Sequence, residues 1–188
     1  MMRQIVRALI GLFLFATAHS VSAQSDYPFV AKDFEVPEGL VTEDFRLRML
    51  SINDVVKDFE AVMASKANLQ TLFPDSNWPE GLTLEANLVD VGWHQKEFQR
   101  RTSFTYTVVS PDGGKVLGCV YIYPTRKLGY DADVTFWARE SDQDEPADRA
   151  LEDAVRAWVA AEWPFAKPAF PGRDIPWKDW NALATAQR

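Results

Sequence analysis

The pattern of apolar and polar positions predicts helices first and strands second. Apolar residues recur at helical spacing over 54–72, where Asn53 or Asp54 can cap the first turn, and again over 83–101, where Thr83 precedes Leu84. Period-two alternation then predicts three strands, over 104–109, 115–123 and 131–139. The turn Pro111-Asp112-Gly113-Gly114 predicts that the first two of these strands form a hairpin.

Shorter segments complete the pattern at both ends. Residues 45–50 alternate as a short strand, 147–162 carry an apolar helical stripe, and 167–170 form one more short strand before Pro171-Gly172. The predicted order is β-α-α-β-β-β-α-β. It indicates an α/β (α+β) domain with one mixed, largely antiparallel sheet flanked by helices. A last strand at 167–170 would be an edge strand, which can invite pairing with another chain.

The first residues have the three parts of a secretory signal peptide. Arg3 and Arg7 supply positive charge, residues 8–18 are apolar, and 21–23 read Val-Ser-Ala. The apolar run is short for a membrane span, although an uncleaved anchor is the alternative. We therefore expect cleavage after Ala23 and a periplasmic or secreted protein. The expected organisation is a signal peptide (1–23), an N-terminal linker (24–44), one domain (45–170) and a C-terminal tail (171–188) anchored by Trp177 and Trp180.

Charge and cysteine usage narrow the function classes. The chain carries a net charge of −7, and loss of Arg3 and Arg7 with the signal makes the exported form more acidic. Such a protein is a poor candidate for binding nucleic acid or an anionic membrane surface. Cys119 is the only cysteine, and burial in a strand is the simplest way to protect it in an oxidising compartment. A catalytic thiol is the alternative.

Four stretches resemble the GCN5-related N-acetyltransferase (GNAT) family. They are DVVKDFEAVM (54–63), LTLEANLVDVGWHQKEFQRR (82–101), FTYTVVSPDGGKVLGCVYIYP (104–124) and DADVTFWARE (131–140). The resemblance covers about residues 45–170. It implies a GNAT-like fold, and an acyl-CoA donor held by strand 133–137, with Val134 and Phe136 as the cofactor-binding residues.

The resemblance breaks down at the loop that would wrap the donor's pyrophosphate. In this family that loop is rich in glycine, whereas residues 139–147 contain no glycine and carry four carboxylates. Negative side chains repel a polyanion and already occupy the positive end of a helix dipole. We therefore expect no acetyl-CoA cofactor, with acetyl-CoA use by a divergent enzyme as the alternative.

The strand pattern predicts a polar and aromatic face. Alternation places Tyr121 and Tyr123 on one face of their strand, and Asp133, Thr135 and Trp137 on one face of the next. Together with Tyr106 from the hairpin partner, these residues could line a concave patch for a small ligand. The acids favour a cationic or amine-bearing ligand. The alternative is that the aromatic rings pack beneath the N-terminal helices.

The only histidine after the signal peptide lies on the second helix. Asp90 at i−4 and Glu97 at i+3 share its face. If the protein is an enzyme, His94 or Glu97 could act as the base and Tyr121 or Tyr123 as the acid. An ordinary surface histidine is the bland interpretation, and no metal-binding signature is present.

These observations leave three function classes open. The first is a non-catalytic GNAT-like domain that binds a small amine or a protein partner. The second is a divergent N-acyltransferase, and the third is an interaction module that uses the tail. Whether the protein is an enzyme stays open at this point, as does its oligomeric state.

Overall fold

The computed structural model describes residues 28–139 and 144–186. Within them, six strands form one sheet in the order in which they occur along the chain. All neighbouring strands are antiparallel except the last pair, which is parallel. The strands are β1 (Gly39–Val41), β2 (Arg46–Met49), β3 (Phe104–Val109), β4 (Val116–Tyr123), β5 (Ala132–Ala138) and β6 (Pro168–Ala169).

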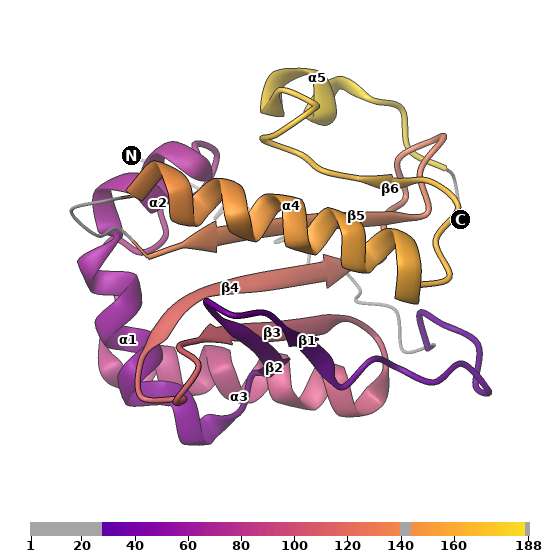
Figure 1. The fold of residues 1–188 in the computed structure, drawn as a ribbon. Helices are drawn as coiled ribbons and strands as arrows, with labels where there is room; N and C mark the ends of the chain where they lie inside the picture. The colour runs from indigo at the N-terminus through magenta and orange to yellow at the C-terminus, as the bar shows by residue number, and fades with distance from the viewer. Residues whose placement is uncertain (1–27, 140–143, 187–188) are drawn as a thin grey trace, which may run out of the picture.

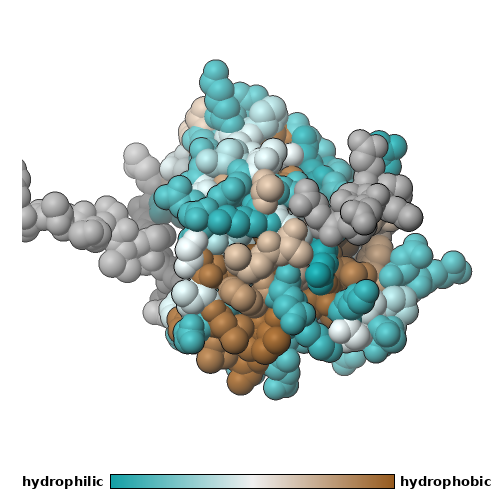
Figure 2. Space-filling model, turned by 90° about the vertical axis from the view of Figure 1, so that its left-hand side faces the viewer, coloured by the Kyte–Doolittle hydropathy of each residue, from teal (hydrophilic) through white to brown (hydrophobic). Residues whose placement is uncertain are grey.

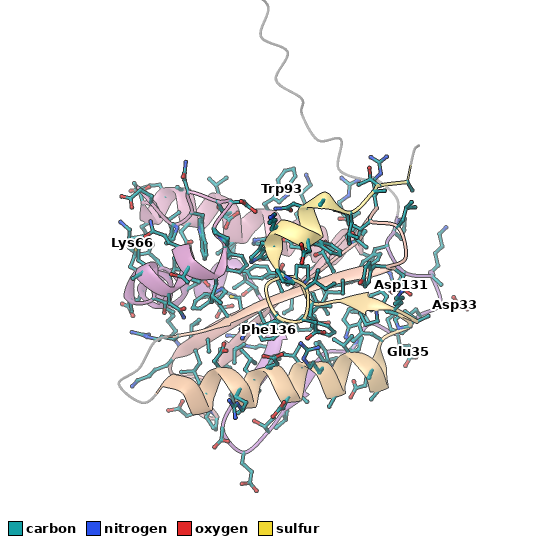
Figure 3. The ribbon with its side chains drawn as sticks, turned by 90° about the horizontal axis from the view of Figure 1, so that it is seen from above. Asp33, Glu35, Lys66, Trp93, Asp131 and Phe136 are labelled. Carbon is teal, nitrogen blue, oxygen red and sulfur yellow. The ribbon has the colours of Figure 1, made fainter. Side chains whose placement is uncertain are left out.

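Helices cover both faces of this sheet (Figures 1 and 3). The long helix after β5 lies on one face, the helices between β2 and β3 lie on the other, and a short C-terminal helix lies above β5 in Figure 1. The helices are the 3-10 turn η1 (Ile52–Asp54), α1 (Val55–Ala64), α2 (Lys66–Leu72), α3 (Leu84–Arg100), α4 (Asp144–Glu162) and α5 (Trp177–Ala182). The predicted fold class is confirmed.

Each face of the sheet has its own apolar core. On one face, α4 buries Leu151, Val155 and Trp158 against strand residues such as Phe104 and Val134. On the other face, α1, α2 and α3 cover a second cluster that includes Val62, Leu69, Val91, Cys119 and Trp137. This division matters for function, because the residues of each strand alternate between the two clusters.

The segment expected to be a linker is built into the fold instead. Residues 39–41 pair with β2 as an additional edge strand, and Val30 is buried in the core. The Arg101 guanidinium donates hydrogen bonds to the carbonyl oxygens of Ala31 and Phe34. Polar composition suggested a loose segment, but long-range hydrogen bonds of this kind leave no local signal in the sequence.

The first helical region differs from the prediction in detail. The expected helix over 54–72 is two helices that meet at Ser65, a fully buried residue between them. The apolar residues that recur along α3 do not all face the core: Leu84 and Leu88 are exposed, whereas Val91 is buried. Figure 2 shows apolar surface in the lower part of the face that it presents. The exposed apolar residues of η1 and α1 include Ile52 and Val56.

A glycine in β4 allows β4 and β5 to approach closely. Gly118 pairs with Ala138 and has φ 154°. A Cβ atom at this position would lie 2.0 Å from the carbonyl oxygen of Trp137, well inside any real contact distance. The same strand is irregular opposite β3, where the register shifts between Val108 and Val109. Glycine is therefore required where the sheet bends.

The two strands at the C-terminal edge separate after a short contact. β6 pairs with β5 only at Ala132 and Asp133, and the Asp131 carboxylate accepts hydrogen bonds from the backbone N–H groups of Ala166 and Lys167, which hold β6 in place. Beyond this point the chain turns back across the end of the sheet into α5. The second half of β5 therefore has no strand beside it on this edge, and the C-terminal tail contacts it instead.

Candidate functional site

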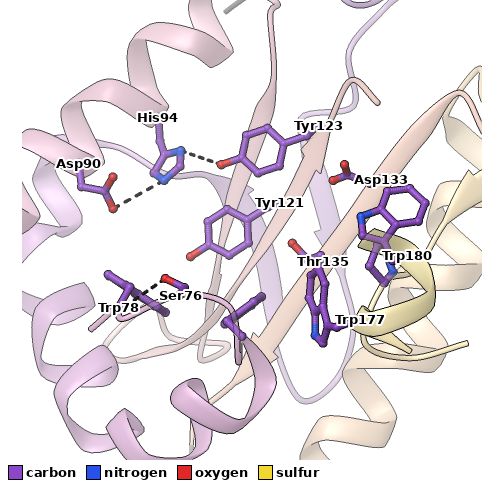
Figure 4. A pocket seen from close by; sticks show the side chains of 12 residues that line it. Ser76, Trp78, Asp90, His94, Tyr121, Tyr123, Asp133, Thr135, Trp177 and Trp180 are labelled. Carbon is purple, nitrogen blue, oxygen red and sulfur yellow. Dashed lines mark hydrogen bonds and ion pairs between the residues drawn. The ribbon is translucent and has the colours of Figure 1, made fainter. Parts of the chain in front are cut away.

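A pocket opens between α3, the end of β4, the first half of β5 and the C-terminal tail (Figure 4). Its volume is about 440 Å³, which is in the range of small-molecule sites. Seven of its lining residues are aromatic or histidine, two are acidic and none is Lys or Arg. The lining residues are Phe73, Ser76, Trp78, Asp90, His94, Tyr121, Tyr123, Asp133, Thr135, Pro171, Trp177 and Trp180.

The floor of the pocket is formed by two cross-strand pairs. Tyr121 lies opposite Thr135, and Tyr123 lies opposite Asp133, in the antiparallel pairing of β4 with β5. Because side chains alternate along a strand, all four point to the same face. These four residues were predicted from the alternation to share one face, and the structure places all of them in the pocket wall.

The two tyrosines are neutral phenols with their rings stacked side by side. Their ring centroids are 6.2 Å apart and nearly parallel. Burial raises the pKa of Tyr121 and Tyr123 well above the usual value, and nearby acids raise both further. The Tyr121 hydroxyl oxygen accepts a hydrogen bond from the indole N–H of Trp137 at 3.2 Å. The tyrosines therefore provide aromatic surface and hydroxyl groups, not negative charge.

His94 connects α3 to this floor. Its Nδ1 lies 3.1 Å from the Thr105 hydroxyl and 3.4 Å from the Tyr123 hydroxyl. Its Nε2 lies 3.7 Å from a carboxylate oxygen of Asp90, one helical turn earlier. A carboxylate and a hydroxyl on opposite sides of an imidazole fix the orientation of the ring. The expected Asp90–His94 pair is present, and the ring lines the pocket.

Asp133 is the acidic group inside the pocket. Burial raises the pKa of its carboxyl to about 7. Among the residues that the structure describes, no hydrogen-bond donor or cation contacts this carboxylate. A bound cation would stabilise the ionised form of such a carboxylate, because it compensates for the loss of hydration on burial.

The tail supplies the wall opposite α3. The Trp177 indole N–H donates to the carbonyl oxygen of Leu72 at 2.7 Å, which ties α5 to the end of α2. Trp180 is buried and packs against Tyr130. The tryptophans were predicted to anchor the tail, but their role as a pocket wall was not predicted. Two tryptophans in a short polar tail were the only signal in the sequence.

Three of the residues expected to bind a ligand or to act in catalysis lie outside the pocket lining. Tyr106 is fully buried in the α4-side core and its hydroxyl donates to the carbonyl oxygen of Pro37. Trp137 is on the pocket side of β5 but lies fully buried beneath Tyr121. Glu97 is buried at the end of α3, where its carboxylate accepts a hydrogen bond from Ser103. The expectation that Tyr106 and Trp137 line the concave patch is therefore wrong, and Glu97 does not line the pocket either.

Val134 and Phe136, the residues assigned to an acyl-CoA donor, face the other core. Only their backbone groups could reach a ligand at the free edge of β5. That edge is contacted by Arg173 from the tail, whose guanidinium stacks 4.4 Å from the Phe136 ring and lies 3.5 Å from the Phe136 carbonyl oxygen. Bidentate hydrogen bonds of 2.6 and 2.8 Å tie the same guanidinium to Asp148 of α4.

The acidic loop that departs from the family pattern lies mostly outside the described residues. The structure does describe the second and third turns of α4, where Asp148 and Glu152 both pair with Arg173. Glu152 also pairs with Arg156. This network fills the space between the start of α4 and the free edge of β5 with the chain's own side chains.

Cys119 lies beneath the pocket and not in it. The thiol is buried in β4 as expected, 3.5 Å from a carboxylate oxygen of Asp58. Burial raises the pKa of this thiol well above its usual value, and the negative charge of Asp58 raises it further. Asn87 donates a second hydrogen bond to the same carboxylate. The thiol is therefore a protonated structural group, which removes the support for a catalytic cysteine.

The described part of the chain carries neither a metal-binding cluster nor a membrane-spanning helix. No cluster of three or more His, Cys, Asp or Glu side chains there could hold a metal ion. None of the described helices is long and apolar enough to cross a membrane.

Comparison with protein-family models and with curated protein sequences finds no match. Comparison with solved structures does find relatives in fold. An acetyltransferase from Salmonella typhimurium that modifies the N-terminal serine of ribosomal protein L7/L12 matches with a TM-score of 0.55 and 17% identity, over 70% of this chain and 72% of that one. The ribosomal-protein-S5-alanine acetyltransferase from Vibrio fischeri matches with a TM-score of 0.53 and 16% identity, over 66% and 67% of the two chains.

A third neighbour was solved with its ligands. The microcin C7 self-immunity acetyltransferase, in complex with acetyl-CoA and AMP, matches with a TM-score of 0.51 and 12% identity, over 67% of this chain and 69% of that one. At identities this low, similarity establishes architecture and not activity. The chain therefore has the GNAT-like acetyltransferase fold that its sequence predicted.

Proposed function

We propose that this GNAT-like domain binds a small amine-bearing cation in the aromatic pocket, and that it does so without an acyl-CoA donor. The observation that carries the proposal is Asp133, a carboxylate inside an aromatic pocket that has no Lys or Arg in its lining. An ammonium group gains from a buried carboxylate and from the faces of aromatic rings at the same time. A neutral ligand lacks the charge–charge part of this gain, and an anionic ligand is repelled by the carboxylate.

The free edge of β5 supports the second half of the proposal. The family resemblance places a donor arm along this edge, where Arg173 now contacts Phe136. The guanidinium is 15% exposed and paired with two acids. Moving it aside would leave Asp148 without its cation and Glu152 with Arg156 alone, which is costly for partly buried groups. The residues present therefore do not fit an acyl-CoA arm in this arrangement.

The competing function is a divergent N-acyltransferase. The fold favours it, and so does the contact between His94 and Tyr123, which places a possible base beside a possible acid in the amine pocket. Under this hypothesis the amine in the pocket is the acceptor, so both functions use the same cation site. They differ in whether the protein binds coenzyme A.

Thermal unfolding of the chain from Gln24 to Arg188 separates the two functions. The protein is heated alone, with millimolar butylammonium, with butanol as the neutral control, and with coenzyme A. We expect butylammonium alone to raise the melting temperature. At ten times its dissociation constant it should stabilise by about 1.4 kcal/mol, a shift of a few degrees.

The same experiment includes two variants. Asp133→Asn should abolish the butylammonium shift, whereas Asp153→Asn, an equal charge change at an exposed position on α4, should keep it. Equal shifts with butanol and butylammonium would contradict cation binding. A shift with coenzyme A would favour the acyltransferase.

A further inference from the structure

The pocket holds a second carboxylate, on the side opposite the first. Asp133 extends from β5, and Asp90 extends from α3; in Figure 4 they lie on either side of the two tyrosine rings. Asp90 stands at the rim, with 53% of its side chain exposed, and its recorded partner is His94 at 3.7 Å. Asp133 lies deeper, beside Tyr123 on the neighbouring strand.

The surface between the two carboxylates is aromatic. Starting from Asp133, it consists of the stacked rings of Tyr123 and Tyr121 and then the His94 ring, whose centroid is 5.5 Å from that of Tyr121. Flat, apolar ring surfaces suit a chain of methylene groups, and the ends of such a chain would reach the two acids. The opposite wall, with Trp177 and Trp180, is also aromatic.

Charge balance points to a ligand with two positive ends. With no Lys or Arg in the lining, a monoamine can neutralise only one of the two carboxylates. The other, Asp90, would keep only His94 at 3.7 Å as its partner, so a negative group at the rim would remain available to a second cation. A ligand with an ammonium group at each end can pair with both.

We infer that the pocket recognises a linear α,ω-diamine or polyamine, with one ammonium group held by Asp133 inside the pocket and the other by Asp90 at the rim. This inference rests on the proposed function, since it names the class of cation that the pocket takes. Under this inference Asp90 binds the ligand directly, and His94 holds the Asp90 carboxylate in position. The aromatic floor then selects for the length of the methylene chain.

Calorimetric titration tests the second charge separately from the first. The chain is titrated with butylamine and with a series of linear α,ω-diamines from propane to octane, at about pH 8, where the Asp133 carboxyl is ionised and the amines remain protonated. We expect one chain length to bind at least about fivefold more tightly than butylamine, the gain from one additional partly exposed ion pair. Asp90→Asn should reduce that ratio to near one while butylamine binding is retained.

Each outcome has a distinct meaning. A ratio near one for every diamine in the unmodified protein would overturn this inference while the amine-binding function stands. An undiminished ratio in Asp90→Asn would also overturn it, because the second ammonium group would then bind elsewhere. Absence of binding by butylamine and by all diamines would overturn the proposed function itself. The ratio is informative even if Asp90→Asn disturbs His94, since such a disturbance affects both ligands.

Discussion

Asp133 lies opposite Tyr123 on the pocket side of the sheet. The environment of its carboxyl group determines the pH above which it is ionised and can bind a cation. Burial raises the pKa of this carboxyl to about 7. Below that pH the group is protonated and neutral, and above it the group is ionised. A cation binds the ionised form more tightly, so the affinity for a cation must rise as the pH rises through about 7 and level off above it.

We therefore predict that butylammonium affinity falls as the pH is lowered from about 8 to about 5, approaching tenfold per pH unit well below 7. Calorimetry at several pH values measures this profile. His94, Asp90 and Tyr123 also face the pocket, so Asp133→Asn serves as the control: its residual affinity should have lost the step near pH 7. A step of the same size in that variant would assign the titration to another group.

Individual side chains also show what the sequence could and could not predict. Alternation correctly grouped Tyr121 with Tyr123, and Asp133 with Thr135. It failed for Tyr106, because alternation within β3 does not reveal its register against β4. Tyr106 pairs with Val120, and the pair therefore faces the other core. Register is a long-range property, set by packing and not by local pattern.

At the scale of elements, the close approach of β4 and β5 shapes the pocket floor. We predict that Gly118→Ala destabilises the protein by several kcal/mol, on the order of 3 kcal/mol or more, because the added Cβ would overlap the Trp137 carbonyl oxygen. Urea unfolding followed by tryptophan fluorescence measures the loss. Gly114→Ala, in the hairpin turn with only the exposed Asp112 side chain nearby, is the matched control and should cost far less. Equal losses would show that β4 does not need a glycine at position 118.

The contact between the tail and α4 is the second element-level feature. Arg173→Ala leaves Asp148 and Glu152 without their shared cation, so we predict a loss of about 1–3 kcal/mol in the free energy of unfolding. Arg149→Ala, an exposed arginine on the same helix, should change it by no more than about 0.5 kcal/mol. Urea unfolding at neutral pH compares the two. A loss no greater for Arg173→Ala than for Arg149→Ala would mean that the network does not hold the tail to α4.

The helices and strands of the fold could be predicted, but the tail that completes the pocket could not. Hydrophobic period and turn chemistry are local, and they located α3, α4 and the β3–β4 hairpin. The pocket wall instead depends on a hydrogen bond between Trp177 and Leu72, more than one hundred positions apart in the chain. Strand β1 was missed because it lies in a polar segment with little periodicity. Its pairing with β2 therefore left no local pattern in the sequence.

For the whole molecule, the compartment decides which ligands it can meet. The amino-terminal pattern of Arg3, Arg7 and Val-Ser-Ala at 21–23 predicts export with cleavage after Ala23. After expression of the full sequence in a bacterium with an outer membrane, we expect the periplasmic fraction to contain a protein that begins at Gln24. Intact mass spectrometry of that fraction checks this expectation. A full-length protein in the cytoplasm would contradict it and would restore access to acyl-CoA.

The account as a whole depends on a cation sitting beside the Asp133 carboxylate, and the most direct measurement is the pKa of that group with and without ligand. Carbon NMR of the aspartate carboxyl groups, with Asp133→Asn used to assign the signal, gives this value. Without ligand we expect a pKa of about 7. With saturating butylammonium we expect it to fall by about one unit for each tenfold preference for the ionised form. An unchanged pKa in the presence of saturating butylammonium would contradict cation binding at Asp133.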